Sequence, residues 1–268
     1  MKTIREELTV TRKEYITPHY IRVYLTGKNV HLFDNTTIGI NNKIAIPPKN
    51  CSKVYFPEYD YEKMEWKPLS EEIRPSIRTY THRGIDLEKK EIWIDFVAHG
   101  ENGPASAWAT NAKVGDKLGV MMKDGKSELY AKAKNYVLVA DSTGIPVISA
   151  ILESLSEDEK AVCLLEVFDK DEIQKIHTKA DVHFIWTYNQ HPEKGSDLSA
   201  IFQELTLPVI SKFGYVAAEF STVKDIRNYL RKDLRWGQEE LYAYSYWKSG
   251  IAEDKSLTER RSEKETTE

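Results

Sequence analysis

The pattern of apolar residues changes near residue 130, and this change constrains the fold of the 268-residue chain more than any other feature. Before it, short runs of β-branched and aromatic residues follow one another between turn residues, as in an antiparallel sandwich or barrel. After it, apolar strands alternate with amphipathic helices, as in a parallel sheet covered by helices. The sequence therefore predicts a β-barrel plus α/β fold, with an N-terminal antiparallel barrel over residues 1–130 and a C-terminal parallel-sheet domain over residues 131–252. Residues 253–268 are predicted to form a charged tail, either a frayed helix or disordered.

The individual elements follow from the same patterns. In the first half we expect strands at residues 10–15, 20–25, 38–46, 77–81, 91–98 and 117–121, a loop-rich stretch between Pro47 and Pro75, and a helix at residues 104–111 that begins with a Gly-Pro pair. In the second half we expect strands at residues 136–140, 161–168, 182–186 and 214–218, and helices at residues 147–155, near 170, and at 197–204 and 221–232.

Composition excludes several classes of protein. The formal net charge of −4 argues against a general nucleic-acid binder. Two cysteines, Cys51 and Cys163, cannot form a disulfide scaffold and fit a reducing compartment. Because there is no secretory h-region and no run of the roughly 20 apolar residues that a spanning helix needs, we expect a cytoplasmic protein with no membrane insertion. The seven histidines show no metal-ligand spacing, so no metal site is expected. The oligomeric state is not predicted.

The run Arg78-Thr79-Tyr80-Thr81 is the first candidate for a flavin site. Along a strand, Arg78 and Tyr80 project from one face while Thr79 points the other way. A flavin needs a cation for its phosphate, an aromatic plane against its ring and a small hydroxyl near the ring edge, and this strand supplies all three. An ordinary strand in which Tyr80 packs and Arg78 pairs with a carboxylate is the alternative interpretation.

A second segment strengthens the flavin interpretation. His99 closes a strand, and Gly103-Pro104-Ala105-Ser106 opens a helix. The unpaired N–H groups at a helix N-terminus suit a pyrophosphate, and Ser106 adds a hydroxyl donor. Trp108 lies on the same short helix, where it packs either on an adenine or on the barrel.

These segments, taken in order, resemble the siderophore-interacting protein family within the ferredoxin–NADP reductase-like superfamily. The motifs that carry the resemblance lie at residues 78–81, 95–100, 103–108, 115–116, 141–146, 218–219 and 246–250, so the likeness covers roughly residues 8–252. It implies an FAD-dependent oxidoreductase that transfers electrons to a ferric siderophore and releases Fe(II) in intracellular iron acquisition. NADH or NADPH is the implied electron donor, and a ferredoxin-type protein donor stays open. The alternatives are a reductase of free flavin, a quinone or an electron carrier, and a siderophore-binding protein without redox function.

The resemblance also implies the roles of individual residues. Arg78 would bind an FAD phosphate, Tyr80 and Thr81 would line the isoalloxazine, and the segment from His99 to Ser106 would hold the pyrophosphate. No side-chain acid, base or nucleophile is required, because the cofactor carries the chemistry. The expected cofactor-binding residues are Arg78, Thr79, Tyr80, Thr81, Phe96, Val97, His99, Gly103, Ala105, Ser106, Trp108, Asp141, Thr143 and Trp247.

The second half offers a nucleotide site of lower specificity. Asp141-Ser142-Thr143-Gly144 follows a buried strand, at the edge where open α/β sheets bind ligands, but it is not a Gly-x-Gly-x-x-Gly fingerprint. A capping turn with Ser142 or Thr143 as N-cap is the alternative. The aromatic run that ends at Trp247 either covers the flavin or packs the C-terminus onto the barrel.

Basic residues and one histidine complete the candidate site. Ferric siderophores are often anionic, so the resemblance implies a basic pocket formed by Lys49, Lys126 and Lys248, although surface lysines are commonly just solvated. His82 stands where the family commonly has an aliphatic residue. We favour a partly exposed strand residue at this position over one that tunes the flavin.

Overall fold

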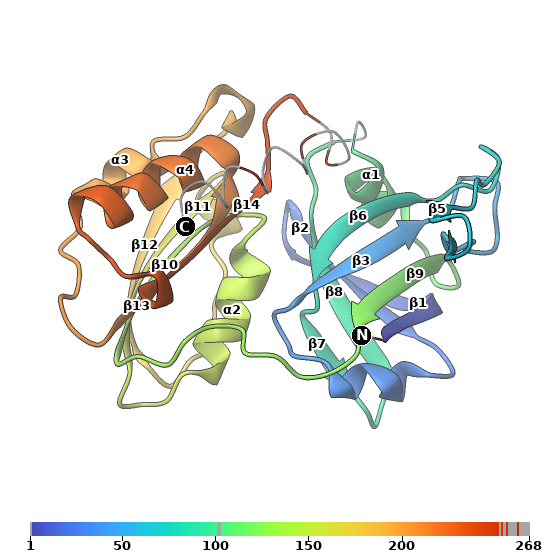
Figure 1. The fold of residues 1–268 in the computed structure, drawn as a ribbon, viewed down its shortest axis with the longest axis horizontal. Coiled ribbons are helices and arrows are strands. Elements are labelled where there is room, and N and C mark those ends of the chain that lie inside the picture. Colours follow the sequence, from blue (N-terminus) through green and yellow to red (C-terminus); the bar gives the residue numbers. More distant parts are fainter. Residues whose placement is uncertain (1, 101–102, 252, 254–255, 257–261, 263–268) are drawn as a thin grey trace. The chain divides into compact units, whose positions relative to one another are not determined.

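The computed structural model describes residues 2–100 and 103–251 together with Glu253, Ser256 and Ser262. The chain divides into two compact units, residues 1–127 and residues 128–268 (Figure 1). The predicted division after residue 130 lies close to this one. The predicted tail, residues 253–268, falls almost entirely outside the described residues, as do positions 101 and 102 of the motif before the first helix.

A curled antiparallel sheet builds the N-terminal unit, which confirms the predicted fold class for this half. Within the described residues it has seven strands in the order β6-β3-β9-β1-β2-β8-β7. Its curl depends on β1, whose 15 residues pair with β9 along the first part and with β2 along the second, with a register shift between Val10 and Arg12. The strands are β1 (Thr3–Thr17), β2 (Tyr20–Thr26), β3 (Asn41–Ile46), β6 (Ser76–Thr81), β7 (Gly84–Asp86), β8 (Glu91–Val97) and β9 (Lys117–Lys123).

Alternating side chains fill the inside of this sheet. Leu8, Ile44 and Ile94 are fully buried, as expected where every second residue of a strand faces the core. Helix α1 (Pro104–Asn111) has the predicted bounds and contributes Ala105 and Ala109 to the same core.

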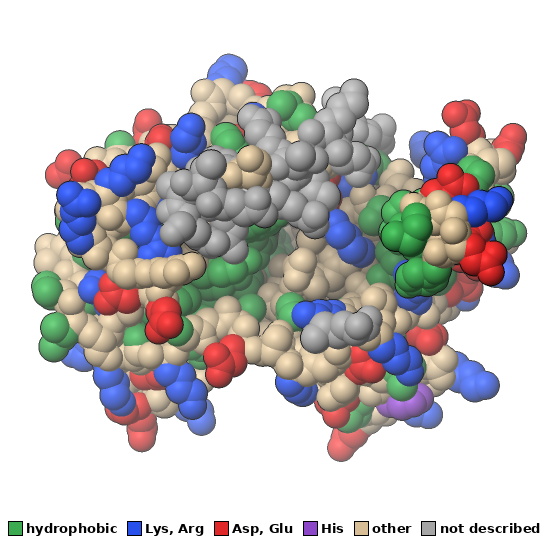
Figure 2. All heavy atoms as spheres, in the orientation of Figure 1, with side chains coloured by type: hydrophobic (Ala, Val, Ile, Leu, Met, Phe, Trp, Pro, Cys, Tyr) green, Lys and Arg blue, Asp and Glu red, His purple; other side chains and the backbone are tan. Residues whose placement is uncertain are grey.

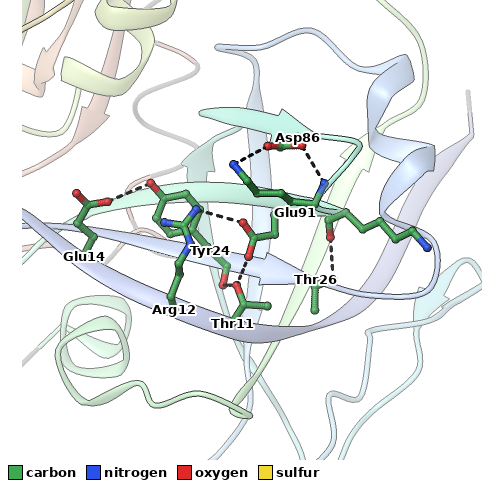
Figure 3. A network of polar contacts seen from close by, with 9 residues as sticks. Thr11, Arg12, Glu14, Tyr24, Thr26, Asp86 and Glu91 are labelled. Carbon is green, nitrogen blue, oxygen red and sulfur yellow. Dashed lines mark hydrogen bonds and ion pairs between the residues drawn. The ribbon is translucent and has the colours of Figure 1, made fainter.

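Charged side chains on β8 link it to β2 and, across β2, to β1. Asp95 on β8 accepts two hydrogen bonds from Arg22 on β2, at 2.7 and 2.8 Å, and forms an ion pair with Arg83. In a second network, Glu91 accepts hydrogen bonds from the Thr11 hydroxyl at 2.6 Å and from Arg12 at 3.2 Å (Figure 3). Both networks link residues that are distant in sequence, so they stabilise the order β1-β2-β8 within the sheet.

The proline-rich stretch between β3 and β6 is an excursion from the sheet, as predicted. Its ordered part is a small hairpin, β4 (Tyr59–Asp60) and β5 (Glu65–Trp66), which exposes Tyr61, Met64 and Trp66. Hydrophobic side chains gather over this hairpin in Figure 2, while lysine and arginine side chains are interspersed with acidic ones over the rest of the face in view.

The C-terminal unit is a parallel sheet with helices on its faces, also as predicted. Within the described residues it has five strands in the order β12-β11-β10-β13-β14. Helices α3 and α4 pack on the face that carries Val137 and Val139, and α2 packs against β10 (Figure 1). The elements are β10 (Asn135–Asp141), α2 (Ile145–Ser154), β11 (Lys160–Val167), β12 (Asp181–Tyr188), α3 (Leu198–Gln203), β13 (Lys212–Glu219), α4 (Phe220–Asn228), a π-helical turn (Tyr229–Asp233) and β14 (Leu241–Trp247). None of the helices in the described part of the chain is long and apolar enough to cross a membrane.

One expectation for this unit was wrong. The helix expected near Lys170 is a single 3-10 turn, because the Asp169 side chain caps it and the backbone becomes extended at Ile173. The aromatic run that ends at Trp247 forms β14, parallel to β13, and belongs to this sheet.

Candidate functional site

Strand β6 presents Arg78 and Tyr80 on one face. Arg78 lies opposite the core residue Ile44 of β3, and its Nη1 donates to the carbonyl of Ile77 at 2.6 Å. Thr79 points the other way, and its hydroxyl is hydrogen-bonded to the Lys43 ammonium. The Thr79 side chain is therefore separated from the Tyr80 face, and only its backbone is available to a flavin on that face.

An aromatic run connects this strand to the helix. The rings of Tyr80 and Phe96 are 4.6 Å apart, and those of Phe96 and Trp108 are 5.6 Å apart. Phe96 is fully buried, so it supports its two neighbours and has no exposed surface for a cofactor, contrary to the expectation of a direct contact. Tyr80 and Trp108 are half-buried. Trp108 thus packs on the barrel through Phe96.

The N-terminus of α1 lies at the end of β8, beyond Val97. Gly103 is the N-cap residue without a side-chain cap, and a Cβ added there would lie 2.5 Å from the His99 ring. The Ser106 hydroxyl is fully buried; it accepts from the His99 N–H at 3.0 Å and donates to the Gly100 carbonyl at 2.8 Å. This hydroxyl therefore fixes the strand end to the helix and is not the pyrophosphate donor that was expected. The backbone of the first turn, with the positive end of the helix dipole, is the part that suits a phosphate.

His82 is fully buried, which contradicts the expectation of a partly exposed residue. Its backbone carbonyl accepts from the Gly39 N–H at 2.7 Å, and its backbone N–H donates to the Ile40 carbonyl at 2.8 Å. Neither its ring nitrogens nor the amide of buried Asn42, which lies opposite Tyr80, has a hydrogen-bond partner within the described part of the chain. Burial, and next the charge of Lys126, lower the pKa of His82 from 6.5 to about 4, so its ring is neutral.

His82 and Asn42 are buried, so, like Phe96, they have no exposed surface for a cofactor, and the half-buried Tyr80 ring and the first turn of α1 are the parts that suit FAD. A buried polar atom without a partner is costly, so these two side chains reduce the stability of the core. Asn42 was not foreseen from the sequence. The alternation of Asn42 with the apolar residues Ile44 and Ile46 was the signal that its side chain points to the core.

The three predicted substrate lysines come from different parts of the chain. Lys49 follows the carboxyl end of β3, whereas Lys126 follows β9, whose antiparallel pairing brings its end to the start of β3. The two lysines therefore follow opposite ends of the same strand. Lys126 donates to the Thr36 carbonyl at 2.7 Å and is the lysine close to His82. Lys248 belongs to the C-terminal unit, where its ammonium lies 4.5 Å from the centre of the Phe220 ring.

In the C-terminal unit, Asp141 is the centre of the predicted nucleotide edge. Its carboxylate accepts four hydrogen bonds: from the N–H and hydroxyl of Thr143 at 2.8 and 2.5 Å, from the Glu219 N–H at 2.9 Å and from the Trp247 indole at 2.8 Å. Burial raises the pKa of Asp141, and these bonds act against that rise. Asp141 therefore positions the loop and the strand ends, and Trp247 is engaged here through its indole N–H.

The turn after Asp141 brings the start of α2 close to β13. Gly144 is the N-cap of α2, in place of Ser142 or Thr143, and it has no side-chain cap. A Cβ at Gly144 would lie 2.2 Å from the Ala217 carbonyl oxygen of β13. The helix thus begins directly against the neighbouring strand, with its first-turn N–H groups at the carboxyl edge of the sheet, where open α/β sheets bind nucleotides.

A curled antiparallel sheet with an aromatic face and a helix N-terminus, followed by a parallel sheet with a tight turn at its carboxyl edge, is the architecture of the ferredoxin-reductase-like fold. The structure of phthalate dioxygenase reductase shares this fold, with a TM-score of 0.58 at 16% identity over 90% of this chain and 68% of that one. Among the described residues no group of three or more His, Cys, Asp or Glu side chains could hold a metal ion.

The chain belongs to the siderophore-interacting protein family. The siderophore-interacting FAD-binding domain matches residues 9–127, and the siderophore-interacting protein domain matches residues 133–250. Ferric vibriobactin reductase ViuB of Vibrio cholerae is 30% identical over 255 residues, which cover 94% of this chain and 93% of that protein. The siderophore-interacting protein SipS of Aeromonas hydrophila superposes with a TM-score of 0.82 at 27% identity, over 97% and 98% of the two chains. The protein is therefore an FAD-dependent oxidoreductase, as the sequence predicted.

Proposed function

We propose that this protein reduces ferric siderophores, with electrons that a nicotinamide nucleotide delivers to bound FAD. The observation that carries the proposal is the run of rings from half-buried Tyr80 through Phe96 to Trp108, which joins the flavin strand to the N-terminus of α1. The activity named for the Vibrio relative supports a ferric siderophore as the acceptor.

The residues of the N-terminal unit would orient the cofactor. The Arg78 guanidinium and the first-turn N–H groups of α1 would bind its phosphates, and the Tyr80 ring would lie against the flavin plane. When bound, FAD supplies the conversion of a two-electron donor into single-electron transfers.

The overall reaction balances without an additional co-reactant. One nicotinamide nucleotide is oxidised by loss of a hydride equivalent, two Fe(III) ions each gain one electron, and one proton is released. Fe(II) is held far less tightly than Fe(III) by oxygen-rich chelators, so the siderophore releases the iron. Lys126, next to the buried His82, is the cation that we assign to an anionic siderophore near the flavin strand.

Anaerobic spectroscopy tests the proposal in separate steps. Purified protein should carry flavin absorbance near ~450 nm, a nucleotide should bleach it, and ferric siderophore should restore it while Fe(II) is trapped by a chelator. Restoration by a quinone or free flavin alone would indicate a different reductase. Absence of flavin, even after reconstitution with FAD, would leave a binding protein without redox function.

A pair of variants tests the role of the aromatic run. Tyr80→Leu removes the ring that is proposed to face the flavin, and we expect FAD to bind about tenfold more weakly, a loss comparable to one aromatic contact. Tyr15→Leu is the matched control, because Tyr15 is exposed on β1. Equal FAD affinity in the two variants would refute the assignment of Tyr80.

A further inference from the structure

Strand β12 forms one edge of the parallel sheet in the C-terminal unit. Among the described residues it pairs with β11 alone, and its eight residues run beside that strand without a register shift. An edge strand presents backbone N–H and C=O groups on its outer side, where they can pair with another strand. The outer side of β12 is therefore a template for one more strand.

The hydrogen bonds at the two ends of β12 show which residues face outward. The Asp181 N–H donates to the Glu159 carbonyl at 3.1 Å, and the Asn189 N–H donates to the Val167 carbonyl at 2.8 Å. The odd-numbered residues therefore bond toward β11. Because the register is continuous and alternate residues of a strand bond to the same neighbour, the even-numbered residues direct their N–H and C=O groups outward.

These outward residues are Val182, Phe184, Trp186 and Tyr188. Their outward backbone groups have no hydrogen-bond partner in the described part of the chain. A second strand laid along this edge could therefore bond to every one of them.

The edge of β12 lacks the features that usually protect an edge strand. Such strands are commonly short, interrupted by a bulge or a proline, or supplied with lysines. The edge strand β7 of the N-terminal sheet follows this rule, because it has three residues and its Asp86 forms an ion pair with Lys89 at 3.0 Å. β12 contains no proline, lysine or arginine, and its one acidic residue, Asp181, stands at its first position. Its edge is thus open to pairing along the whole strand.

The side chains of the outward residues form a partly exposed apolar strip. The rings of Phe184 and Trp186 stack at 6.4 Å with an interplanar angle of 13°, and Tyr188 is 54% exposed. Ile185 lies on the other face of the sheet, where it packs against the core beneath α3 and α4. Pairing at this edge would therefore cover apolar side chains together with the open backbone groups.

A second copy of β12, running antiparallel, matches this edge. A two-fold axis through Ile185 places Phe184 opposite Trp186 of the second copy, and Val182 opposite Tyr188 of the second copy. All four residues direct their backbone groups outward, so each opposed pair can exchange two hydrogen bonds. The opposed side chains share one face of the sheet, where aromatic and β-branched cross-strand pairs are stabilising.

The charges are compatible with the same register. Asp181 falls opposite Asn189 of the second copy, so the paired stretch opposes no like charges, which would be destabilising. Asp181 also has a counter-charge in its own chain, the Lys160 ammonium at 3.8 Å. The strand is therefore complementary to itself in backbone groups, side chains and charge.

We infer that two copies of this protein associate through antiparallel pairing of their β12 strands, which joins their two parallel sheets into one. The contact is one strand wide on each side, smaller than the roughly 800 Å² per partner of a standard interface, so the dimer is weak and forms as the protein concentration rises. It lies within the C-terminal unit and is independent of the proposed reaction.

Amide hydrogen exchange, resolved by residue with NMR, tests the inference on the wild-type, FAD-loaded protein. At two protein concentrations about a hundredfold apart, we expect the amides of Val182, Phe184 and Trp186 to exchange at least about tenfold more slowly in the concentrated sample. The amides of the edge strand β7 should exchange equally in both samples. Fast exchange from β12 at both concentrations would show an unpaired edge and overturn the inference. Equal protection at both would show that a segment of the same chain covers the edge, and would also overturn it.

A pair of variants then tests the strand itself by sedimentation velocity. Tyr188→Lys places an ammonium group on the paired edge opposite Val182, and we expect the dimer dissociation constant to rise at least about tenfold. Tyr61→Lys is the matched control, because Tyr61 is 82% exposed on the hairpin of the other unit, and it should dimerise as wild type does. Both variants should retain their flavin. Equal dissociation constants in the two variants would contradict pairing through β12.

Discussion

Replacement of His82 by leucine tests the most unusual group in the N-terminal unit. The ring is fully buried, neither nitrogen has a partner within the described residues, and burial together with the Lys126 charge lowers its pKa from 6.5 to about 4. At pH 7, His82→Leu should be at least as stable as wild type, because a leucine leaves no polar atom unpaired in the core.

The pH dependence follows from the direction of this shift. In the unfolded chain the imidazole takes up a proton as the pH falls below about 6.5, whereas in the folded protein it stays neutral down to about pH 4. Since the unfolded state binds more protons between these values, the stability contributed by this group is complete above 6.5 and is lost as the pH falls toward 4. One pKa unit corresponds to about 1.4 kcal/mol, so wild type should lose about 3 kcal/mol through His82 across this window.

Urea unfolding at several pH values between 7.5 and 4.5 measures the effect. The difference in unfolding free energy between His82→Leu and wild type should grow in favour of the variant as the pH falls. His31→Leu, at an exposed position, should show no such trend. A difference that does not change with pH, or an NMR titration of His82 with a pKa near 6.5, would refute the reasoning.

Three further substitutions test other parts of the structure. Asp95→Asn leaves the largely buried Arg22 guanidinium without its counter-charge and should lower the unfolding free energy by about 3 kcal/mol in urea denaturation; a loss near zero would contradict the role of the pair. Gly144→Ala puts a methyl group against the Ala217 carbonyl, and it should lower the melting temperature by several degrees in calorimetry. The control Gly237→Ala, at an exposed position with a negative φ and space for a Cβ, should leave it nearly unchanged; equal melting temperatures of the two variants would contradict the steric argument. Asp141→Asn replaces one acceptor oxygen by a donor and should cost about 2 kcal/mol, with a parallel loss of hydrogen-exchange protection at the strand ends; unchanged protection would argue against its positioning role.

Local signals explain why much of the fold was predictable. The Gly-Pro start fixed the beginning of α1 at Pro104, and the continuous apolar run at residues 136–140 identified the central strand β10. β14 was missed although Tyr242, Tyr244 and Tyr246 alternate with smaller residues. That alternation is the period of a strand, but an assumed contact with the flavin offered a competing explanation for the aromatic side chains.

Side-chain roles were less predictable because they depend on partners far away in sequence. The Arg-x-Tyr-Thr run gave the correct strand, but buried His82 is held by backbone hydrogen bonds to Gly39 and Ile40, and its pKa is lowered by burial and by the charge of Lys126. The Ser106 hydroxyl was predicted to bind a ligand. Both of its hydrogen bonds instead go to the backbone of His99 and Gly100, just before the helix. The sequence motifs identified these residues, but the hydrogen-bond partners of their polar atoms depend on tertiary packing.

The bonding of Asp141 also constrains how the protein is made. Its carboxylate is synthesised early in the second unit, but two of its donors, the Glu219 N–H and the Trp247 indole, come 78 and 106 residues later. During synthesis on the ribosome, Asp141 on β10 therefore lacks two of its hydrogen-bond donors until nearly the whole unit has been synthesised. Because domains generally fold as units and the N-terminal one emerges first, we expect arrested nascent chains that end before residue 247 to hold a protease-resistant barrel followed by a protease-sensitive second half.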